Sequence, residues 1–291
     1  MPTLADWRGQ LSASALVGAP GDFTPLILDG ERLYLARYQA YEAQLAAQLL
    51  SRAADQPAVD EAQLSDSLQR LFANNTQQPD WQRLAAAQAV RKRVAVISGG
   101  PGTGKTTIIN AIIKLFGEVR ARILLAAPTG RAAKRMAETS GREARTIHRL
   151  LEYSPKEDGF ARNEDSPLAC GLLVVDEASM MDTLLFYHLL KAVPLGATLV
   201  LVGDVHQLPS VGPGNVLADV INSGVVPVVE LTEIFRQSAE SEIICNAHLI
   251  NKGEVPSLES SKDRLSDFYF IHQNDPEKAA ELIVDLVRNH I

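Results

Sequence analysis

Val94-Ala95-Val96-Ile97-Ser98-Gly99-Gly100-Pro101-Gly102-Thr103-Gly104-Lys105-Thr106-Thr107 is the stretch of the sequence that decides the fold. Its first four residues form an apolar run typical of a buried strand, and residues 99–106 match the phosphate-binding loop pattern. Residues 108–113 continue with isoleucines at helical spacing. The loop therefore lies between a strand and a helix, as this motif requires, and this context disfavours a merely structural glycine turn.

The residue types in this loop suit the chemistry of phosphate binding. Glycines let backbone N–H groups turn toward phosphate oxygens, and the start of the following helix adds positive potential. Lys105 is expected to reach the β- and γ-phosphates, and the Thr106 hydroxyl to bind Mg²⁺. The predicted nucleotide-binding residues are Gly99, Gly100, Pro101, Gly102, Thr103, Gly104, Lys105, Thr106 and Thr107.

Three further apolar runs follow along the chain, at residues 123–127, 172–175 and 199–202, and helix-compatible sequence separates them. Continuous apolar strands that alternate with helices predict an α/β fold with a parallel sheet covered on both faces. Asp80 is expected to cap a helix that runs to Arg91, just before the first strand. Residues 154–167 are polar and contain Gly and Pro, which predicts a surface insertion.

Two carboxylates, Asp176 and Glu177, directly follow the third apolar run. Acids at a strand end are common and carry little weight alone. Here they come about 70 residues after a phosphate-binding loop, where phosphate-loop ATPases place an acid for Mg²⁺ and a second acid for the attacking water. We predict that Asp176 binds Mg²⁺ together with Thr106, and that both acids are catalytic.

The flanking sequence predicts three domains, at residues 1–75, 80–235 and 236–291. In the first, the apolar segments 26–28 and 33–35 flank Asp29-Gly30, which predicts a β-hairpin. Tyr41, Leu45 and Leu49 share one helical face, a second helix is expected over 59–72, and the polar residues 74–79 read as a linker. The last domain is expected to hold a helix to about Lys252, a strand at 268–271 and a final helix that Asp275 caps.

The composition is that of a globular protein, with 46% hydrophobic and 22% charged residues. The start of the chain resembles no secretion signal and no apolar run is long enough to cross a bilayer, so we expect a cytoplasmic protein. Cys170 and Cys245 are too few for a disulfide framework or a four-cysteine metal site. The net charge is −7, yet residues 91–149 hold thirteen Lys and Arg against three Asp and Glu. This asymmetry fits a polyanion-binding face, or else a solvated basic surface.

Further segments occur in a fixed order around the loop and the acidic pair. They are Gln88, residues 127–133 (APTGRAA), 146–150 (TIHRL), 175–180 (VDEASM), 203–211 (GDVHQLPSV) and 231–237 (LTEIFRQ). This ordered set resembles the motifs of superfamily-one DNA helicases, and most of all those of the RecD family, the alpha subunits of exodeoxyribonuclease V (the RecBCD enzyme). The resemblance covers about residues 24–290.

The resemblance implies a RecA-like phosphate-loop NTPase sheet with a small, mostly helical N-terminal domain whose β-hairpin docks the subunit in its complex. It implies ATP and Mg²⁺ as cofactors, single-stranded DNA and RecB- and RecC-like subunits as partners, and no membrane. The implied function is that of a 5′-to-3′ DNA helicase motor in double-strand-break repair and recombination, which couples ATP hydrolysis to translocation on single-stranded DNA.

The resemblance also assigns roles to single residues. Gln88 would bond the adenine edge, Gln207 the γ-phosphate or the attacking water, and Arg236 the γ-phosphate from a second motor domain. Thr129, Arg131 and His148 would contact DNA. Each has a simpler alternative: a polar surface residue for Gln88, a solvated helix face for Arg131, a structural histidine for His148 and an ion pair near Glu233 for Arg236.

Helicases of this class need two RecA-like domains, and later motifs of the second domain are missing from the sequence. We therefore expect the chain to hold the first motor domain and only the start of the second. It is then expected to bind ATP with Mg²⁺, to hydrolyse it poorly and not to unwind DNA alone. Two alternative functions remain open: a generic phosphate-loop ATPase or kinase, and a non-motor assembly module that binds nucleotide structurally.

Overall fold

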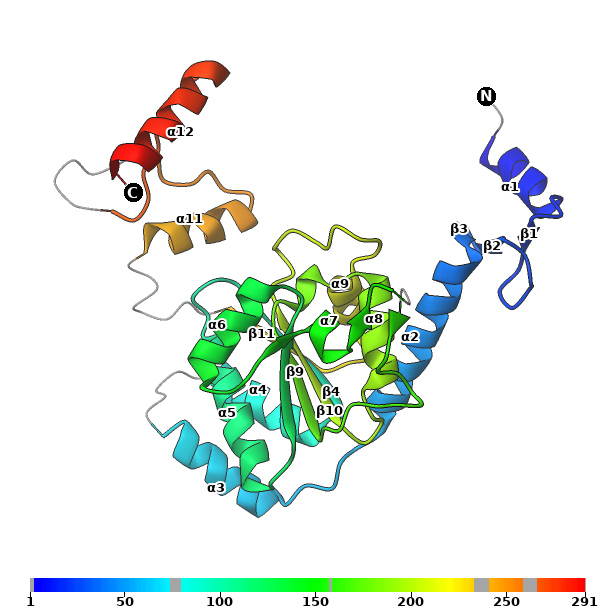
Figure 1. Cartoon of the computed structure of the whole chain (residues 1–291), viewed down its shortest axis with the longest axis horizontal. Coiled ribbons are helices and arrows are strands. Elements are labelled where there is room, and N and C mark those ends of the chain that lie inside the picture. The colour runs from blue at the N-terminus through cyan, green and yellow to red at the C-terminus, as the bar shows by residue number, and fades with distance from the viewer. Residues whose placement is uncertain (1–2, 74–79, 157–158, 233–240, 259–265, 291) are drawn as a thin grey trace. The chain divides into compact units, whose positions relative to one another are not determined.

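The computed structural model describes residues 3–73, 80–156, 159–232, 241–258 and 266–290 (Figure 1). The chain divides into two compact units, Met1–Glu233 and Ile234–Ile291. The phosphate-binding loop, the acidic pair and the predicted DNA contacts all lie in the first unit.

A six-stranded parallel sheet forms the centre of the first unit, with the strand order β11-β4-β10-β9-β5-β6. Its strands are β4 (Val94–Gly99), β5 (Ile123–Ala127), β6 (Arg145–Thr146), β9 (Leu172–Val175), β10 (Thr198–Gly203) and β11 (Val228–Leu231). The four predicted strands and their parallel pairing are thus confirmed. Strand β10 lies between β4 and β9, so the first and third apolar runs of the sequence flank the fourth.

Register brings three chemically important segments to one edge of the sheet. Gly203 pairs with Ser98, and Leu201 pairs with Val175. The residues that follow β4, β9 and β10 therefore lie close together, at the carboxyl edge where open α/β sheets bind ligands.

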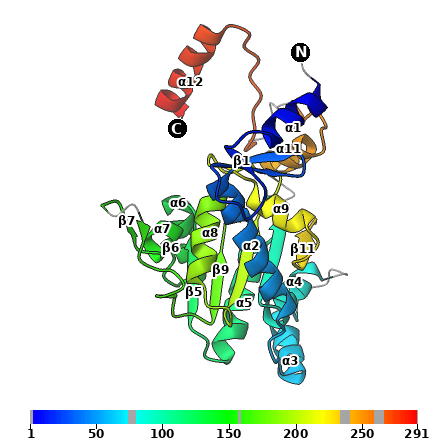
Figure 2. The ribbon, with the colours of Figure 1, turned by 90° about the vertical axis from the view of Figure 1, so that its right-hand side faces the viewer.

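Helices cover both faces of the sheet (Figure 2). Because successive side chains of a strand point to opposite faces, Leu173 and Val175 pack into one core while Leu172 and Val174 pack into the other. The first core takes side chains from α2 (Ala36–Ala54), α7 (Ile147–Leu150), α8 (Thr183–Ala192) and α9 (Val216–Asn222). The second takes them from α3 (Glu61–Leu71), α4 (Trp81–Arg91), α5 (Lys105–Glu118) and α6 (Gly130–Ser140).

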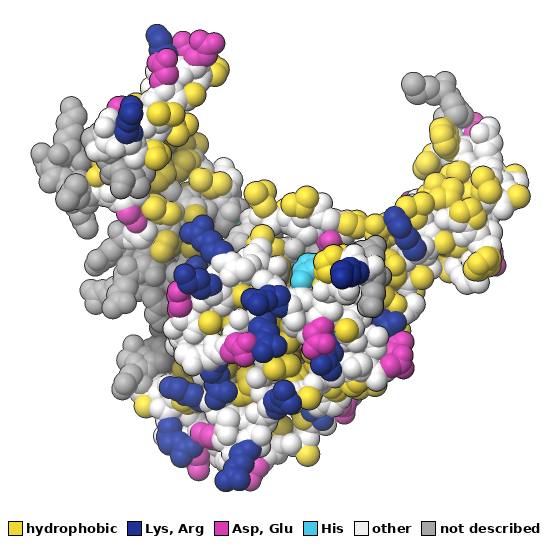
Figure 3. All heavy atoms as spheres, in the orientation of Figure 1, with side chains coloured by type: hydrophobic (Ala, Val, Ile, Leu, Met, Phe, Trp, Pro, Cys, Tyr) yellow, Lys and Arg dark blue, Asp and Glu magenta, His cyan; other side chains and the backbone are white. Residues whose placement is uncertain are grey.

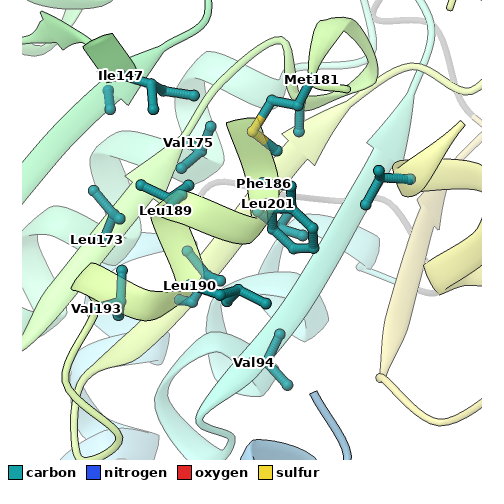
Figure 4. Packing of buried hydrophobic residues seen from close by; sticks show 14 of the residues in the cluster. Val94, Ile147, Leu173, Val175, Met181, Phe186, Leu189, Leu190, Val193 and Leu201 are labelled. Carbon is teal, nitrogen blue, oxygen red and sulfur yellow. The ribbon is translucent and has the colours of Figure 1, made fainter. Parts of the chain in front are cut away.

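Helix α8 forms much of the first core. Its Phe186, Leu189 and Leu190 are buried against Leu173 and Leu201 of the sheet (Figure 4). Three of the four predicted strands, β4, β9 and β10, are buried along their whole length, which is why they lack the alternation of a half-exposed strand, and β5 is buried over its last three residues.

The N-terminal residues form α1 (Leu4–Ser12) and a three-stranded sheet of β1 (Val17–Gly18), β2 (Leu26–Asp29) and β3 (Arg32–Leu35). The predicted hairpin is present, but its turn is shifted by one residue. Asp29 pairs with Arg32, so the two turn residues are Gly30 and Glu31 rather than Asp29 and Gly30. Gly30 has a φ of 60°, as the first central position of a type II′ turn requires.

Helices α2 and α3 pack on the central sheet. Tyr41, Leu45 and Leu49 of α2 join the core beneath α8, and Leu64 and Leu68 of α3 join the core beneath α4 and α5. The helical face predicted for α2 is therefore the buried one. The predicted linker at residues 74–79 lies outside the described residues, and the domain boundary there stays a prediction.

The predicted insertion at 154–167 holds a short hairpin of β7 (Tyr153–Ser154) and β8 (Gly159–Phe160). In the second unit, α11 (Glu242–Asn251) and α12 (Pro276–His290) form where helices were expected, and the Asp275 carboxylate accepts a hydrogen bond from Glu277 N at 3.0 Å. The strand predicted at 268–271 was wrong, because these residues are irregular and the described part of this unit contains no strand to pair with. Among the described helices, none is long and apolar enough to cross a membrane.

Candidate nucleotide-binding site

Two positions of the phosphate-binding loop adopt a backbone that favours glycine. Gly102 has a φ of 76°, and Gly104, at the N-terminus of α5, has a φ of 83°. Gly99 is required for a different reason, since a Cβ there would lie 2.6 Å from Thr103 Oγ1 and 2.9 Å from Leu231 Cβ. The buried Thr103 hydroxyl donates to the Gly100 carbonyl at 2.9 Å, which closes the loop on itself. The loop thus has the tight curvature of an anion cradle.

Lys105 is the cation of this cradle. Its ammonium group donates to the carbonyl oxygens of Gly99 and Gly100, the latter at 3.1 Å. Burial lowers the pKa of Lys105, and the negative charges of Asp204, Glu177 and Asp176 oppose that shift. Lys105 is thus a partly buried cation that interacts with the charges of three carboxylates, at the loop that is predicted to hold the phosphates.

The acidic pair lies at the carboxyl end of β9, facing this cation. Burial raises the pKa of Asp176, while the hydrogen bond from Glu177 N to its Oδ1 (2.9 Å) and the charge of Lys105 lower it. Burial, followed by the neighbouring charge of Asp176, raises the pKa of Glu177. Both carboxylates are thus partly desolvated, and a bound cation or hydrogen-bond donor would stabilise their charged forms.

Asp204 is a third carboxylate of the site, and the sequence analysis missed it as a site residue. It follows β10 as Asp176 follows β9, it is only 2% exposed, and its charge acts on Lys105. Its Oδ1 accepts a hydrogen bond from His206 N at 3.0 Å. The available signal was its position at the end of an apolar strand that was predicted to lie in the same sheet.

Gln207 lies on the loop that follows Asp204, with its side chain exposed. Its backbone N–H donates to the Asp204 carbonyl at 3.2 Å. The far end of the loop packs on the start of α8. Thr183 N donates to the Pro213 carbonyl at 2.9 Å. A Cβ on Gly212 would overlap Asp182, and a Cβ on Gly214 would overlap Thr183. Arg236, the remaining catalytic candidate, lies outside the described residues.

Helix α4 carries two glutamines that are candidates for contact with a nucleotide. Gln82, near its N-terminus, is 6% exposed, and its Nε2 lies 3.5 Å from the Gly104 carbonyl of the loop. Gln88, the predicted adenine contact, is partly buried and lies six residues, or about 9 Å of helix rise, further along the same helix. Gln82 therefore contacts the loop and is a second candidate that the sequence analysis did not consider.

The remaining loop residues lie in the first turn of α5, where Thr106 is partly buried and Thr107 is exposed. Three observations bear on whether these residues fit a nucleotide with Mg²⁺. The loop has a backbone that a Cβ at Gly99 would block, Lys105 supplies a cation, and Glu177 Oε2 is buried without a hydrogen-bond partner among the described residues. These features fit the bound group: Thr106 and Asp176 would hold Mg²⁺, and the loop and Lys105 the phosphates.

The predicted DNA contacts lie on two other helices. The Thr129 hydroxyl accepts a hydrogen bond from Ala132 N at 3.2 Å and so caps α6, whose second residue, Arg131, is exposed. His148 is exposed on α7, with its ring centroid 5.7 Å from that of Tyr153 and 5.8 Å from that of Phe160. Lys and Arg side chains spread over the face that carries α5 and α6, interspersed with Asp and Glu (Figure 3).

Two family models match the chain. Residues 1–34 match the N-terminal domain of the RecBCD enzyme subunit RecD, and residues 82–213 match an AAA domain. The second range contains the loop and the acidic pair, so the sheet unit is a nucleotide-binding domain.

Individual relatives agree with these matches. The chain is 40% identical over 201 residues to the ATP-dependent RecD2 DNA helicase of Deinococcus radiodurans, covering 69% of this chain and 27% of that protein. It is 39% identical over 251 residues to the RecBCD enzyme subunit RecD of Mycobacterium tuberculosis strain H37Rv, with coverages of 76% and 41%. To the same subunit of Mycolicibacterium smegmatis it is 33% identical over 307 residues, with coverages of 96% and 53%. The chain therefore spans about half, or less, of the length of these relatives.

Proposed function

We propose, from the premise that this chain belongs to the RecD family of DNA helicase proteins, that it is the nucleotide-binding part of a DNA motor. In this proposal it binds ATP with Mg²⁺ and couples hydrolysis to movement along single-stranded DNA. One observation carries the proposal: Lys105 lies at the carboxyl edge of the sheet among the charges of Asp176, Glu177 and Asp204. This is the arrangement of cation and carboxylates that phosphoryl transfer to water uses.

Each residue has a role in the proposed reaction. The loop of Gly99–Thr107 and Lys105 hold the phosphates, and Thr106 and Asp176 hold Mg²⁺, which when bound neutralises charge that develops on the phosphates. Glu177 orients the attacking water and accepts its proton. Gln207 senses the γ-phosphate from the loop after β10, and Arg236 supplies the arginine whose charge stabilises the transition state.

DNA binding is proposed for the basic surface of the same unit. Thr129 and Arg131 follow β5, and His148 precedes the β7–β8 hairpin. Hydroxyl and cationic groups suit sequence-independent contacts to phosphates. By family, we propose 5′-to-3′ translocation in double-strand-break repair and recombination, with RecB- and RecC-like subunits as partners.

The nucleotide part of the proposal is tested by calorimetric titration of the purified chain with ATP and Mg²⁺. We expect saturable binding that Lys105→Ala weakens by about 10- to 150-fold, the loss expected for one charge-assisted hydrogen bond. Lys114→Ala, a change on the same helix outside the loop, is the control and should bind as the wild type does. Absence of heat with the wild-type chain would refute the proposal.

A second candidate function, a module that docks a partner and binds nucleotide structurally, is favoured by one observation. Large apolar side chains are exposed on the N-terminal segment, with Trp7 at 55% and Phe23 fully exposed, and hydrophobic side chains gather there (Figure 3). Labelled single-stranded DNA, titrated with and without a non-hydrolysable ATP analogue, separates the two functions. Salt-sensitive binding that the analogue changes supports the motor, and no binding at low salt supports the module.

A further inference from the structure

Three buried side-chain atoms of the described residues have no hydrogen-bond partner: Arg52 Nε, Glu177 Oε2 and Ser179 Oγ. Arg52 engages its other nitrogen atoms in structural contacts. The other two atoms lie two residues apart, in the turn that follows β9. Ser179 is only 5% exposed, and a buried hydroxyl without a partner is rare enough in folded proteins to need an explanation.

The turn itself is unusual. Glu177 has a φ of 53° and a ψ of 40°, a left-handed conformation that residues other than glycine seldom adopt. It precedes a three-residue 3₁₀-helix, η1 (Ala178–Met180), and its carbonyl accepts a hydrogen bond from Met180 N at 3.1 Å. The strained backbone places the Glu177 carboxylate and the Ser179 hydroxyl in the same turn.

The same turn packs directly on the end of β10. A Cβ on Gly203 would lie 3.2 Å from Ser179 N and 2.7 Å from Leu217 Cδ2, so a larger residue has no room there. The residue after Gly203 is Asp204, whose backbone and carboxylate organise the loop of Gln207. Ser179 therefore stands between the segment that carries the catalytic acid and the segment that carries the proposed γ-phosphate sensor.

The hydrogen-bonding capacity of the neighbours decides what Ser179 can do. Glu177 Oε2 is an acceptor that lacks a donor, and the charged neighbour Asp176 is an acceptor too. Lys105 already donates to the carbonyl oxygens of Gly99 and Gly100. The Ser179 hydroxyl is thus a hydrogen-bond donor in the same turn as Glu177, and it has no acceptor among the described residues.

We propose that Ser179 is a positioning residue for ATP hydrolysis: with nucleotide bound, its hydroxyl donates to the Glu177 carboxylate and fixes it toward the attacking water. This inference rests on the proposed function. It assigns Ser179 no contact with the nucleotide and no proton transfer of its own. It explains why a polar side chain is buried at the contact between η1 and β10, where alanine would fit equally well.

The test compares Ser179→Ala with Ser67→Ala. Ser67 is also buried, at 1% exposed, but its hydroxyl already donates to Glu118 Oε2 at 2.6 Å, away from the loop. The measurements are urea unfolding without nucleotide, affinity for ATP with Mg²⁺, hydrolysis under single-turnover conditions, and affinity for ADP with aluminium fluoride. We expect Ser179→Ala to keep the stability and the ATP affinity of the wild type. Its hydrolysis rate should fall by about tenfold or more, with weaker binding of the aluminium fluoride complex, because the acid is misplaced.

Ser67→Ala is expected to do the opposite, losing stability while its hydrolysis per folded molecule stays unchanged. The inference is overturned if Ser179→Ala hydrolyses ATP at the wild-type rate, or if it loses stability as Ser67→Ala does. A wild-type chain that binds no ATP, or that shows no single-turnover hydrolysis, would instead contradict the proposed function. The two failures are therefore distinguishable.

Discussion

Arg52 donates from Nη1 to the carbonyl oxygen of Pro194 at 3.0 Å, although 142 positions separate the two residues in the sequence. Its Nη2 donates to the Val193 carbonyl, so a guanidinium group from α2 closes the C-terminal end of α8. The side chain is 1% exposed, and burial lowers its pKa to about 10, which leaves it charged at neutral pH. A positive charge at this end of a helix is favourable, because the last carbonyl groups point toward it.

Replacing this group should destabilise the first unit. We expect Arg52→Ala to lower the free energy of unfolding by about 3–5 kcal/mol, because it leaves a cavity and carbonyl oxygens without donors. Arg70→Ala, which removes an exposed ion pair with Glu118, is the control and should cost about 1 kcal/mol or less. Urea unfolding followed by circular dichroism measures both, and equal losses would contradict the proposed anchoring role of Arg52.

Glu177→Gln should separate stability from catalysis. Burial and Asp176 raise the pKa of Glu177 in the folded chain, so ionisation of this carboxyl group at neutral pH costs stability. We expect the free energy of unfolding of Glu177→Gln at pH 7, measured by urea unfolding, to exceed that of the wild type by about 1 kcal/mol. The gain should shrink as the pH falls toward 4.5, the ordinary pKa, because the wild-type carboxyl group then becomes protonated. Hydrolysis should fall by about 10²–10⁴-fold, and a destabilised variant at pH 7 would contradict this account.

Substitution of Gly99 in the loop can be compared with substitution of Gly117 near the end of α5. A Cβ on Gly99 meets Thr103 and Leu231, so Gly99→Ala should cost about 1–3 kcal/mol of stability and weaken ATP binding. A Cβ on Gly117 of α5 meets nothing within 4 Å, and Gly117→Ala should stabilise the chain by about 0.5–1 kcal/mol. Thermal unfolding and nucleotide titration of both variants check this contrast. Unchanged ATP binding in a folded Gly99→Ala variant would show that the cradle tolerates a side chain.

Two glutamines compete for the role of adenine contact. Gln82 touches the loop, whereas Gln88 lies about two helical turns away along α4. We expect Gln82→Ala to weaken ATP binding by about 2- to 12-fold, as the loss of one neutral hydrogen bond implies. Gln88→Ala should bind ATP as the wild type does. The reverse order of affinities would restore Gln88 to the role that the sequence resemblance assigned to it.

The proposed DNA surface predicts a salt effect. Arg131→Ala should weaken binding of single-stranded DNA for every base composition, and reduce the slope of log affinity against log salt by about 0.7, as one lost phosphate contact requires. Arg8→Ala, an exposed change on α1, should leave that slope unchanged. Fluorescence anisotropy with a labelled oligonucleotide at several salt concentrations gives both slopes, and identical slopes would remove Arg131 from the DNA surface.

The central sheet and its loop were predictable because their signals are local. Each central strand is a continuous apolar run, since both of its faces are buried, and the loop at residues 99–106 has a fixed pattern of residue types. The order of the strands was not predicted, because apolar runs alone do not tell which strands are neighbours in a sheet. Their register, which brings Asp176 and Asp204 beside Lys105, appears only once β10 lies between β4 and β9.

Other features depend on contacts between distant segments, which the sequence does not reveal. The packing of α2 on α8 through Arg52 and Pro194 is one example. The strand expected at 268–271 failed for the converse reason: aromatic residues favour a strand only where a neighbouring strand pairs with them. The role of Asp204 was missed although it lies in the quoted segment 203–211, because a single acid after an apolar run is common and carries little weight without the register of the strands.

Helix α8 is held at both of its ends by other segments of the first unit. Its first residue, Thr183, is fastened to the glycine-rich end of the loop that carries Gln207, and its last carbonyl groups are fastened to Arg52. A helix of ten residues is a stiff rod of about 15 Å. The loop that carries Gln207 and helix α2 therefore contact opposite ends of the same short helix, so the position of α8 depends on both segments.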